Sequence, residues 1–225
     1  MNAGLFFVTA VVTFGLLVFV SRKFGKDGIY TWIGMAVVVA NVLVCKNVNL
    51  FGLSATLGNV LFGTVFLATD ILTEQYGVKS AKKAVWMGIS AEIITIILTQ
   101  LALLFIPNEL DFVQDSMKNI FGLFPRVAIA SCSMFVVSNT LDIYLFEKIR
   151  EKTNGKYLFL RNNVATIVSQ CIENFLFYII AFLGIYPMAD IVSMTITCCI
   201  IEIVVALMDT PFLYWAVSSK EEELK

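Results

Sequence analysis

Three glutamates stand near the middle of three different long apolar runs, at Glu92, Glu173 and Glu202. Each of these runs is long enough to cross a lipid bilayer. A carboxylate at the bilayer centre costs about 2.5 kcal/mol or more on insertion scales, and so short a side chain cannot easily snorkel to water. The three positions therefore predict a polar site at membrane depth, with these glutamates lining it.

The run 162–184 carries the densest set of polar residues around one of these glutamates. Gln170, Glu173 and Asn174 share one stripe at helical spacing, and Phe177 continues it. The stripe therefore marks 162–184 as the central element of the predicted site.

Other spans add polar stripes of their own, so the simplest geometry turns five stripes inward around a shared cavity. The members that we assign to substrate binding outside 162–184 are Asp70, Glu92, Asn139, Asp142 and Glu202. Two alternatives stay open. Serine, threonine, asparagine and glutamine often bond helix to helix at about 0.6 kcal/mol each. For Asp70, Glu74 and Asp142 the alternative is an ion pair with a lysine or arginine of the basic loops.

Composition identifies the elements that must position these residues. Apolar residues make up 59% of the 225-residue chain and charged residues 15%, which is typical of an integral membrane protein. We predict an all-α, polytopic membrane helical bundle forming a single domain, 1–225, with an extra N-terminal span at 3–21 and a six-helix core within 28–217. The seven predicted spans are 3–21, 28–45, 56–75, 84–106, 126–147, 162–184 and 189–217. Segment 47–57 is left open as a loop, an interfacial stretch or part of a broken helix.

Basic residues predict the orientation of the bundle. Of the 16 lysines and arginines, only Lys46, Lys118 and Arg126 fall outside the loops that follow the odd-numbered spans and the C-terminal tail. The positive-inside rule then places the C-terminus in the cytoplasm and the N-terminus outside. The opposite loop, 107–125, is acidic, which agrees with this orientation.

Several function classes are disfavoured by what the chain lacks. Histidine is absent, and no nucleophile elbow, zinc-protease motif or phosphate-binding glycine loop occurs. The five cysteines have no metal-ligand spacing and are interpreted as small packing residues. Basic residues in short loops without interleaved aromatic residues do not indicate nucleic-acid binding. We therefore expect no enzyme, no metal, no cofactor and no nucleic-acid partner.

Four motifs in order give the chain a family resemblance. They are Phe66-Leu67-Ala68-Thr69-Asp70-Ile71-Leu72-Thr73-Glu74-Gln75-Tyr76-Gly77, the segment from Arg126 through Ser138-Asn139-Thr140-Leu141-Asp142 to Arg150, the segment from Leu160-Arg161-Asn162-Asn163 through Ser169-Gln170-Cys171-Ile172-Glu173-Asn174 to Gly184, and Thr210-Pro211. Together they span about 30–217. In these motifs the chain resembles the queuosine precursor transporter family, also called vitamin-uptake-transporter-like proteins.

The resemblance implies a bacterial inner-membrane importer of 7-deazapurines such as preQ0, preQ1 or queuine. At Glu173 the family commonly has aspartate, which keeps the charge, and at Glu202 it commonly has lysine, which reverses it. The energy source is open between facilitated diffusion and coupling to a proton or sodium ion, for which Glu92 is the candidate. Also open are a homodimer, a substrate-binding subunit of a multi-component vitamin importer, and a non-transporting structural protein.

Overall fold

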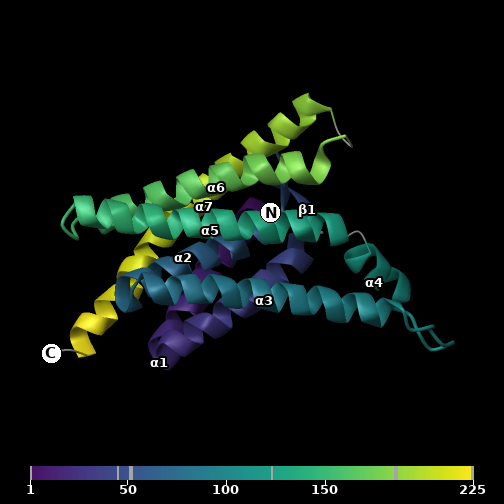
Figure 1. Cartoon of the computed structure of the whole chain (residues 1–225), viewed down its shortest axis with the longest axis horizontal. Helices are drawn as coiled ribbons and strands as arrows, with labels where there is room; N and C mark the ends of the chain where they lie inside the picture. The colour runs from purple at the N-terminus through teal and green to yellow at the C-terminus, as the bar shows by residue number, and fades with distance from the viewer. Residues whose placement is uncertain (1, 45, 51–52, 123, 185–186, 224–225) are drawn as a thin grey trace.

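The computed structural model describes residues 2–44, 46–50, 53–122, 124–184 and 187–223, and these are mostly helical (Figure 1). Its elements are α1 (Asn2–Val44), β1 (Asn47–Leu50), β2 (Leu53–Thr56), α2 (Gly58–Tyr76), α3 (Val78–Leu103), α4 (Gln114–Phe121), α5 (Phe124–Lys152), α6 (Leu158–Phe182) and α7 (Met188–Glu223). Within the described residues, five helices are long and apolar enough to cross a membrane: α1, α3, α5, α6 and α7. The predicted all-α membrane bundle is confirmed.

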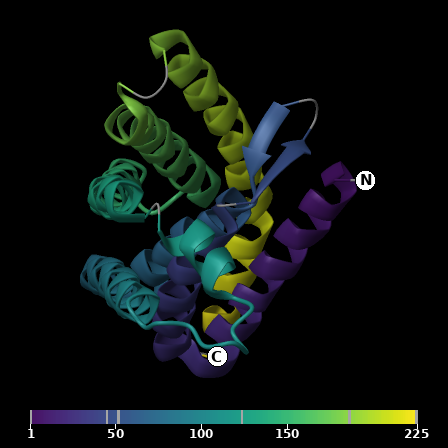
Figure 2. The same cartoon turned by 90° about the vertical axis from the view of Figure 1, so that its right-hand side faces the viewer.

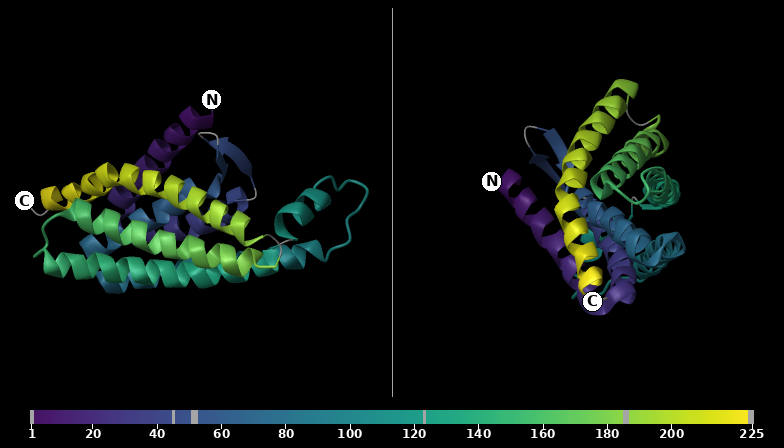
Figure 3. Two further views of the ribbon diagram at one scale, coloured as in Figure 1. Left: turned by 90° about the horizontal axis from the view of Figure 1, so that it is seen from above. Right: turned by 90° about the vertical axis from the view of Figure 1, so that its left-hand side faces the viewer.

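The first two predicted spans, 3–21 and 28–45, correspond to the two helical arms of α1, which meet at a kink. Helix α1 bends sharply at Gly25, whose φ of 58° and ψ of −140° lie outside the helical region. Only glycine adopts such a left-handed φ at little cost, so the residue type fixes the place of the bend. The bend produces two arms that diverge in a V (Figure 2), and the N-terminal arm is inclined to the other helices (Figure 3).

Helix α2 occupies the centre of the bundle and packs against α1, α3, α5 and α7. Its residues from Gly58 to Thr73 are almost all buried. Close approach to α1 depends on Gly58, because a Cβ there would lie 2.8 Å from the carbonyl oxygen of Ala40 and collide with Val44. Small residues at such crossings let membrane helices pack at short range. This packing brings Asp70 into the interior.

Two connections have more structure than the sequence indicates. Segment 47–57, for which we considered a loop, an interfacial stretch or a broken helix, contains the antiparallel hairpin β1–β2, with Asn47 opposite Thr56 and Leu50 opposite Leu53. The hairpin lies between α1 and α7 (Figure 2). The acidic connection 107–125, expected to be a loop, contains α4. Strand pairing and a short helix satisfy backbone groups that a bare loop would leave to water.

The three basic loops that follow the odd-numbered predicted spans lie at one end of the bundle, next to the C-terminal end of α7. A Cβ on Gly25 would lie 3.4 Å from the Tyr76 hydroxyl, so the α1 bend meets the α2–α3 turn. Near the end of α7, Arg22 donates to the Trp215 carbonyl at 2.6 Å, and Gln75 donates to the Ala216 carbonyl at 2.8 Å. The hairpin and α4 lie toward the other end (Figure 3). The basic loops, which are separate in the sequence, are therefore collected at one end of the folded molecule.

Gly58→Ala should destabilise the bundle, because the added methyl meets backbone at the α1–α2 crossing and cannot be accommodated by a rotamer change. Overpacking of this kind costs about 1–3 kcal/mol, so the thermal unfolding midpoint in detergent should fall. Gly34→Ala is the matched control, since its Cβ would find its nearest neighbour, Ala91, at 3.7 Å. Equal midpoints for both variants would contradict the close crossing.

Candidate functional site

The three mid-span glutamates lie on three different helices of the bundle. Glu92 projects from α3 and is 3% exposed, and the half-buried Glu173 and Glu202 project from α6 and α7. Glu173 lies within the range at which its charge interacts with those of both Glu92 and Glu202. A shared site lined by all three stays a prediction.

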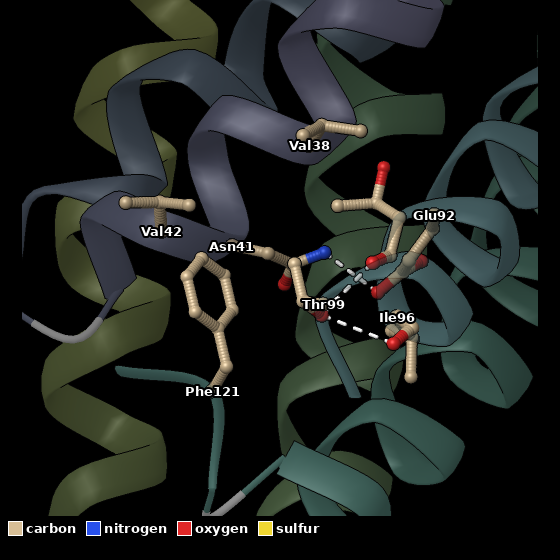
Figure 4. Close-up of a pocket in the computed structure, with 8 residues that line it drawn as sticks. Val38, Asn41, Val42, Glu92, Ile96, Thr99 and Phe121 are labelled. Atoms are coloured by element: carbon tan, nitrogen blue, oxygen red, sulfur yellow. Dashed lines mark hydrogen bonds between the residues drawn. The ribbon is translucent and has the colours of Figure 1, made fainter. Parts of the chain in front are cut away.

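Two of these carboxylates have an amide partner from a different helix. The Asn41 amide of α1 donates to Glu92 Oε1 at 2.6 Å (Figure 4). The Asn174 amide of α6 donates to Glu202 Oε2. Partners that donate to a carboxylate reduce the cost of burying it. Glu92 thus links α3 to α1, and Glu202 links α7 to α6.

A small, partly open pocket lies beside Glu92 (Figure 4). Its lining comes from α1, α3 and the end of α4: Val38, Asn41, Val42, Glu92, Thr95, Ile96, Thr99 and Phe121. Phe121 is held there because the Gln100 amide donates to its carbonyl at 2.6 Å. The expectation of one cavity shared by five stripes is wrong for this pocket, since its lining comes from α1, α3 and α4 alone. Thr95 and Thr99 donate to carbonyls of their own helix, which favours structural roles for their hydroxyls.

A second acidic group lies nearer the basic end, where α2, α5 and α7 meet. Asp70, Asp142 and Asp209 are all fully buried, and Asp70 interacts with the other two. Asp142 Oδ1 accepts hydrogen bonds from the hydroxyls of Thr166 and Ser169, both at 3.2 Å. Asp209 Oδ1 accepts one from the Asn162 amide at 2.8 Å. Sequence spacing placed Asp70 and Asp142 on inward stripes, and the structure makes them neighbours.

Arg161 corrects the interpretation of the basic loops. The sequence placed it in a connection, yet it lies within α6, is 1% exposed and stacks on the Phe146 ring at 5.2 Å. Its Nη2 pairs with Glu74 Oε2 at 2.5 Å, and its Nη1 donates to the Gly155 carbonyl at 2.9 Å. The predicted ion pair is therefore confirmed for Glu74. It is wrong for Asp70 and Asp142, neither of which forms a salt bridge in the part of the chain that the structure describes.

The remaining predicted residues are placed as follows. Asn139 and Gln170 are buried one turn or less from Asp142 and Glu173 in sequence, and the half-buried Phe177 lies one turn beyond Glu173 on α6. Sequence reasoning missed Asn41, because a single asparagine near the end of an apolar run has no distinguishing pattern. It also left Asp209 out of the site, although Asp209 falls at helical spacing from Glu202 and could have been included.

The Glu74–Arg161 pair should contribute to stability well beyond a surface ion pair. Removing one member of a buried pair costs about 3–5 kcal/mol, so Arg161→Gln should lower the thermal midpoint strongly. Arg150→Gln is the control, because Arg150 lies 3.9 Å from Glu74, is 36% exposed and should contribute roughly 1 kcal/mol or less. Adding Glu74→Gln to Arg161→Gln should recover part of the loss. Strict additivity of the two substitutions would contradict the pairing.

Comparison with known proteins places the chain in a family. The profile described as "Putative vitamin uptake transporter" matches residues 56–216. A "Probable queuosine precursor transporter" of Bacillus subtilis (strain 168) is 42% identical over 216 residues, which are 96% of this chain and 94% of the relative. The "Queuosine precursor transporter" of Escherichia coli (strain K12) is 24% identical over 149 residues, which are 66% of this chain and 64% of that protein. No solved structure gives a significant match. The chain belongs to the "Putative vitamin uptake transporter" family and is a membrane transporter rather than an enzyme.

Proposed function

We propose that this protein imports 7-deazapurine precursors of queuosine across the bacterial cytoplasmic membrane. The names of its relatives support this substrate class, and the 42% identity to the Bacillus subtilis protein extends over nearly the whole chain. The structural observation that carries the proposal is that Glu92, Glu173 and Glu202 project from three helices inside the bundle, with Glu173 within charge-interaction range of the other two. A site of this kind suits a small ligand with several N–H donors, because buried carboxylates accept hydrogen bonds and donate none.

Glu173 is the residue that we assign to reading the base. A guanine-like edge presents the ring N1–H and the exocyclic amine side by side, and one carboxylate accepts both. The Gln170 amide can donate to the 6-oxo group, and Phe177 can stack on the ring. Asn174 donates to Glu202, so in this arrangement it orients Glu202 instead of contacting the base.

Glu202 is the residue that we assign to the 7-substituent. A carboxylate favours a cationic aminomethyl group, as in preQ1, over the neutral nitrile of preQ0. Glu92, Asn41 and Phe121 lie toward the end of the bundle opposite the basic segments, and we propose that the substrate approaches past them. Asn139, Asp142 and Asp70 continue the polar interior toward the basic end, and in this scheme the base passes them on release.

The membrane setting completes the proposal. The basic end faces the cytoplasm together with the C-terminus, and the N-terminus lies outside, as the positive-inside rule indicates. A lipid bilayer is the surrounding solvent, and a proton or sodium ion is the candidate coupling partner. Assembly as a homodimer is compatible with this arrangement and is not required by it.

Rescue of queuosine synthesis tests the function directly. A bacterial strain unable to make the precursor should regain queuosine in its tRNA when it expresses this chain and is supplied with preQ1, measured by nucleoside mass spectrometry. Uptake of preQ1 should exceed that of preQ0 if Glu202 has the proposed role, and equal uptake would refute that role. Purified protein reconstituted alone into liposomes should also take up the base. A need for an added ATPase would instead favour the binding-subunit alternative.

Glu173→Gln should weaken base binding by roughly 10- to 100-fold, because a charged acceptor is replaced by a neutral amide that offers one oxygen instead of two. Glu151→Gln, on the exposed surface of α5, is the control and should bind normally. The measurement is the dissociation constant of tritiated preQ1 in detergent, with the unfolding midpoint recorded for each variant. Unchanged affinity in a folded Glu173→Gln protein would remove Glu173 from the site.

A further inference from the structure

The buried polar groups around α2, α5, α6 and α7 have more acceptors than donors. Among the described residues, both Oδ atoms of Asp70, Oδ2 of Asp142 and Oδ2 of Asp209 are buried without a hydrogen-bond donor. So are the side-chain oxygens of Asn139, Asn162, Asn163 and Gln170. Asn162 and Asn163 have fixed amide orientations, because their Nδ2 atoms donate to Asp209 Oδ1 and to the Phe159 carbonyl. An acceptor excess of this size points to a cation or a proton as the complement.

The charges show the same imbalance. The aspartates at positions 70, 142 and 209 come from three helices and are 0% exposed. The cation that interacts with Asp70 is Arg161 of α6, and its guanidinium is already paired with Glu74 at 2.5 Å. The carboxylate of Asp142 also interacts with the negative charge of Glu173 on α6. Three ionised carboxylates with no free cation would be prohibitively costly in this interior.

Asp70 and Asp142 differ in how their oxygens are satisfied. Oδ1 of Asp142 already accepts from the hydroxyls of Thr166 and Ser169, whereas neither oxygen of Asp70 has a donor. If Asp70 binds a proton, its new O–H can donate to the unpartnered Oδ2 of Asp142. One proton then satisfies both groups and removes one negative charge.

We propose that Asp70 and Asp142 form a proton-binding site through which import is coupled to the proton gradient. The proposal rests on the transport function above, and it places coupling at this pair instead of at Glu92. A proton from the outside forms the O–H bond on Asp70 when substrate is loaded. The bond breaks toward the cytoplasm when substrate is released, so one proton enters with each base.

The position of the pair along the bundle suits this role. On α6 the order from the basic end is Arg161, then the Asp142 partners Thr166 and Ser169, then Glu173, a rise of about 20 Å over the whole set. The aspartate pair thus lies between the proposed substrate site and the Glu74–Arg161 ion pair. Glu74 is one helical turn from Asp70, so movement of α2 that breaks this ion pair would also change the surroundings of the proton.

Reconstituted wild-type protein tests the coupling without any substitution. Proteoliposomes are loaded at alkaline pH, the membrane potential is clamped at zero with valinomycin and potassium, and tritiated preQ1 is added outside. An inward gradient of about one pH unit should sustain roughly tenfold accumulation if one proton enters with each base. Accumulation that ignores the pH gradient, or follows a sodium gradient, overturns the inference while leaving import intact. If neither net uptake nor exchange of preQ1 or preQ0 occurs, the proposed function itself fails.

Two variants separate coupling from binding. Asp70→Asn and Asp142→Asn keep the size of the side chain but cannot bind and release a proton. Accumulation of preQ1 driven by the pH gradient should therefore be lost. Exchange of external tritiated preQ1 for unlabelled internal preQ1, which needs no net proton movement, is measured in parallel and shows whether each variant still binds and moves the base. Glu151→Gln should accumulate the base normally. Gradient-driven accumulation at the wild-type level in Asp70→Asn would overturn the proposal, and the wild-type measurement decides the matter if the variants do not fold.

Discussion

Carboxylates inside the hydrocarbon region need donors, and water is not there to provide them. This constraint governs the arrangement of the whole interior. Glu92 obtains its donor from α1, Glu202 from α6, and Asp209 again from α6. Because these amide donors come from helices other than those that carry the carboxylates, the hydrogen bonds fix how the helices pack. The exceptions are therefore the informative groups, and Asp70 is the clearest of them.

Glycine makes this interior possible. Helix α2 can lie at the centre only because Gly58 lets it approach α1 at backbone distance, and Gly25 lets α1 turn back beside it. A central α2 presents Asp70 to α5 and α7 on one side and Glu74 to α6 one turn later. The absence of a side chain at Gly25 and Gly58 thus allows the packing that places the carboxylates of Asp70 and Glu74.

The interior has two chemically different parts. Around Glu173 the carboxylates of Glu92 and Glu202 have amide partners, which suits an uncharged or cationic ligand of moderate size. Around Asp70 and Asp142 the groups are completely buried and packed among small polar side chains, which suits the binding of a proton. A transporter needs both kinds of site if substrate movement is to be driven by an ion. Their proximity within one bundle is the physical basis for proposing such coupling.

The sequence by itself determined the membrane class and the presence of carboxylates within apolar runs, because length, hydropathy and charge are local properties of the chain. Seven spans were predicted, whereas five helices among the described residues are long and apolar enough to cross a membrane, and α2, at the predicted span 56–75, is not one of them. Helical spacing in the sequence also placed Asp70, Asn139, Asp142 and Gln170 on polar stripes that were predicted to face inward, and all four are buried. The tertiary structure alone decided that the charge of Glu173 lies within range of both Glu92 and Glu202, that Asn41 is the partner of Glu92, and that Arg161 is a buried partner of Glu74. These pairings join residues on different helices. Helical periodicity gives the face on which each residue lies, but the depth and rotation of one helix against another depend on glycine contacts and hydrogen bonds that form only when the bundle is assembled.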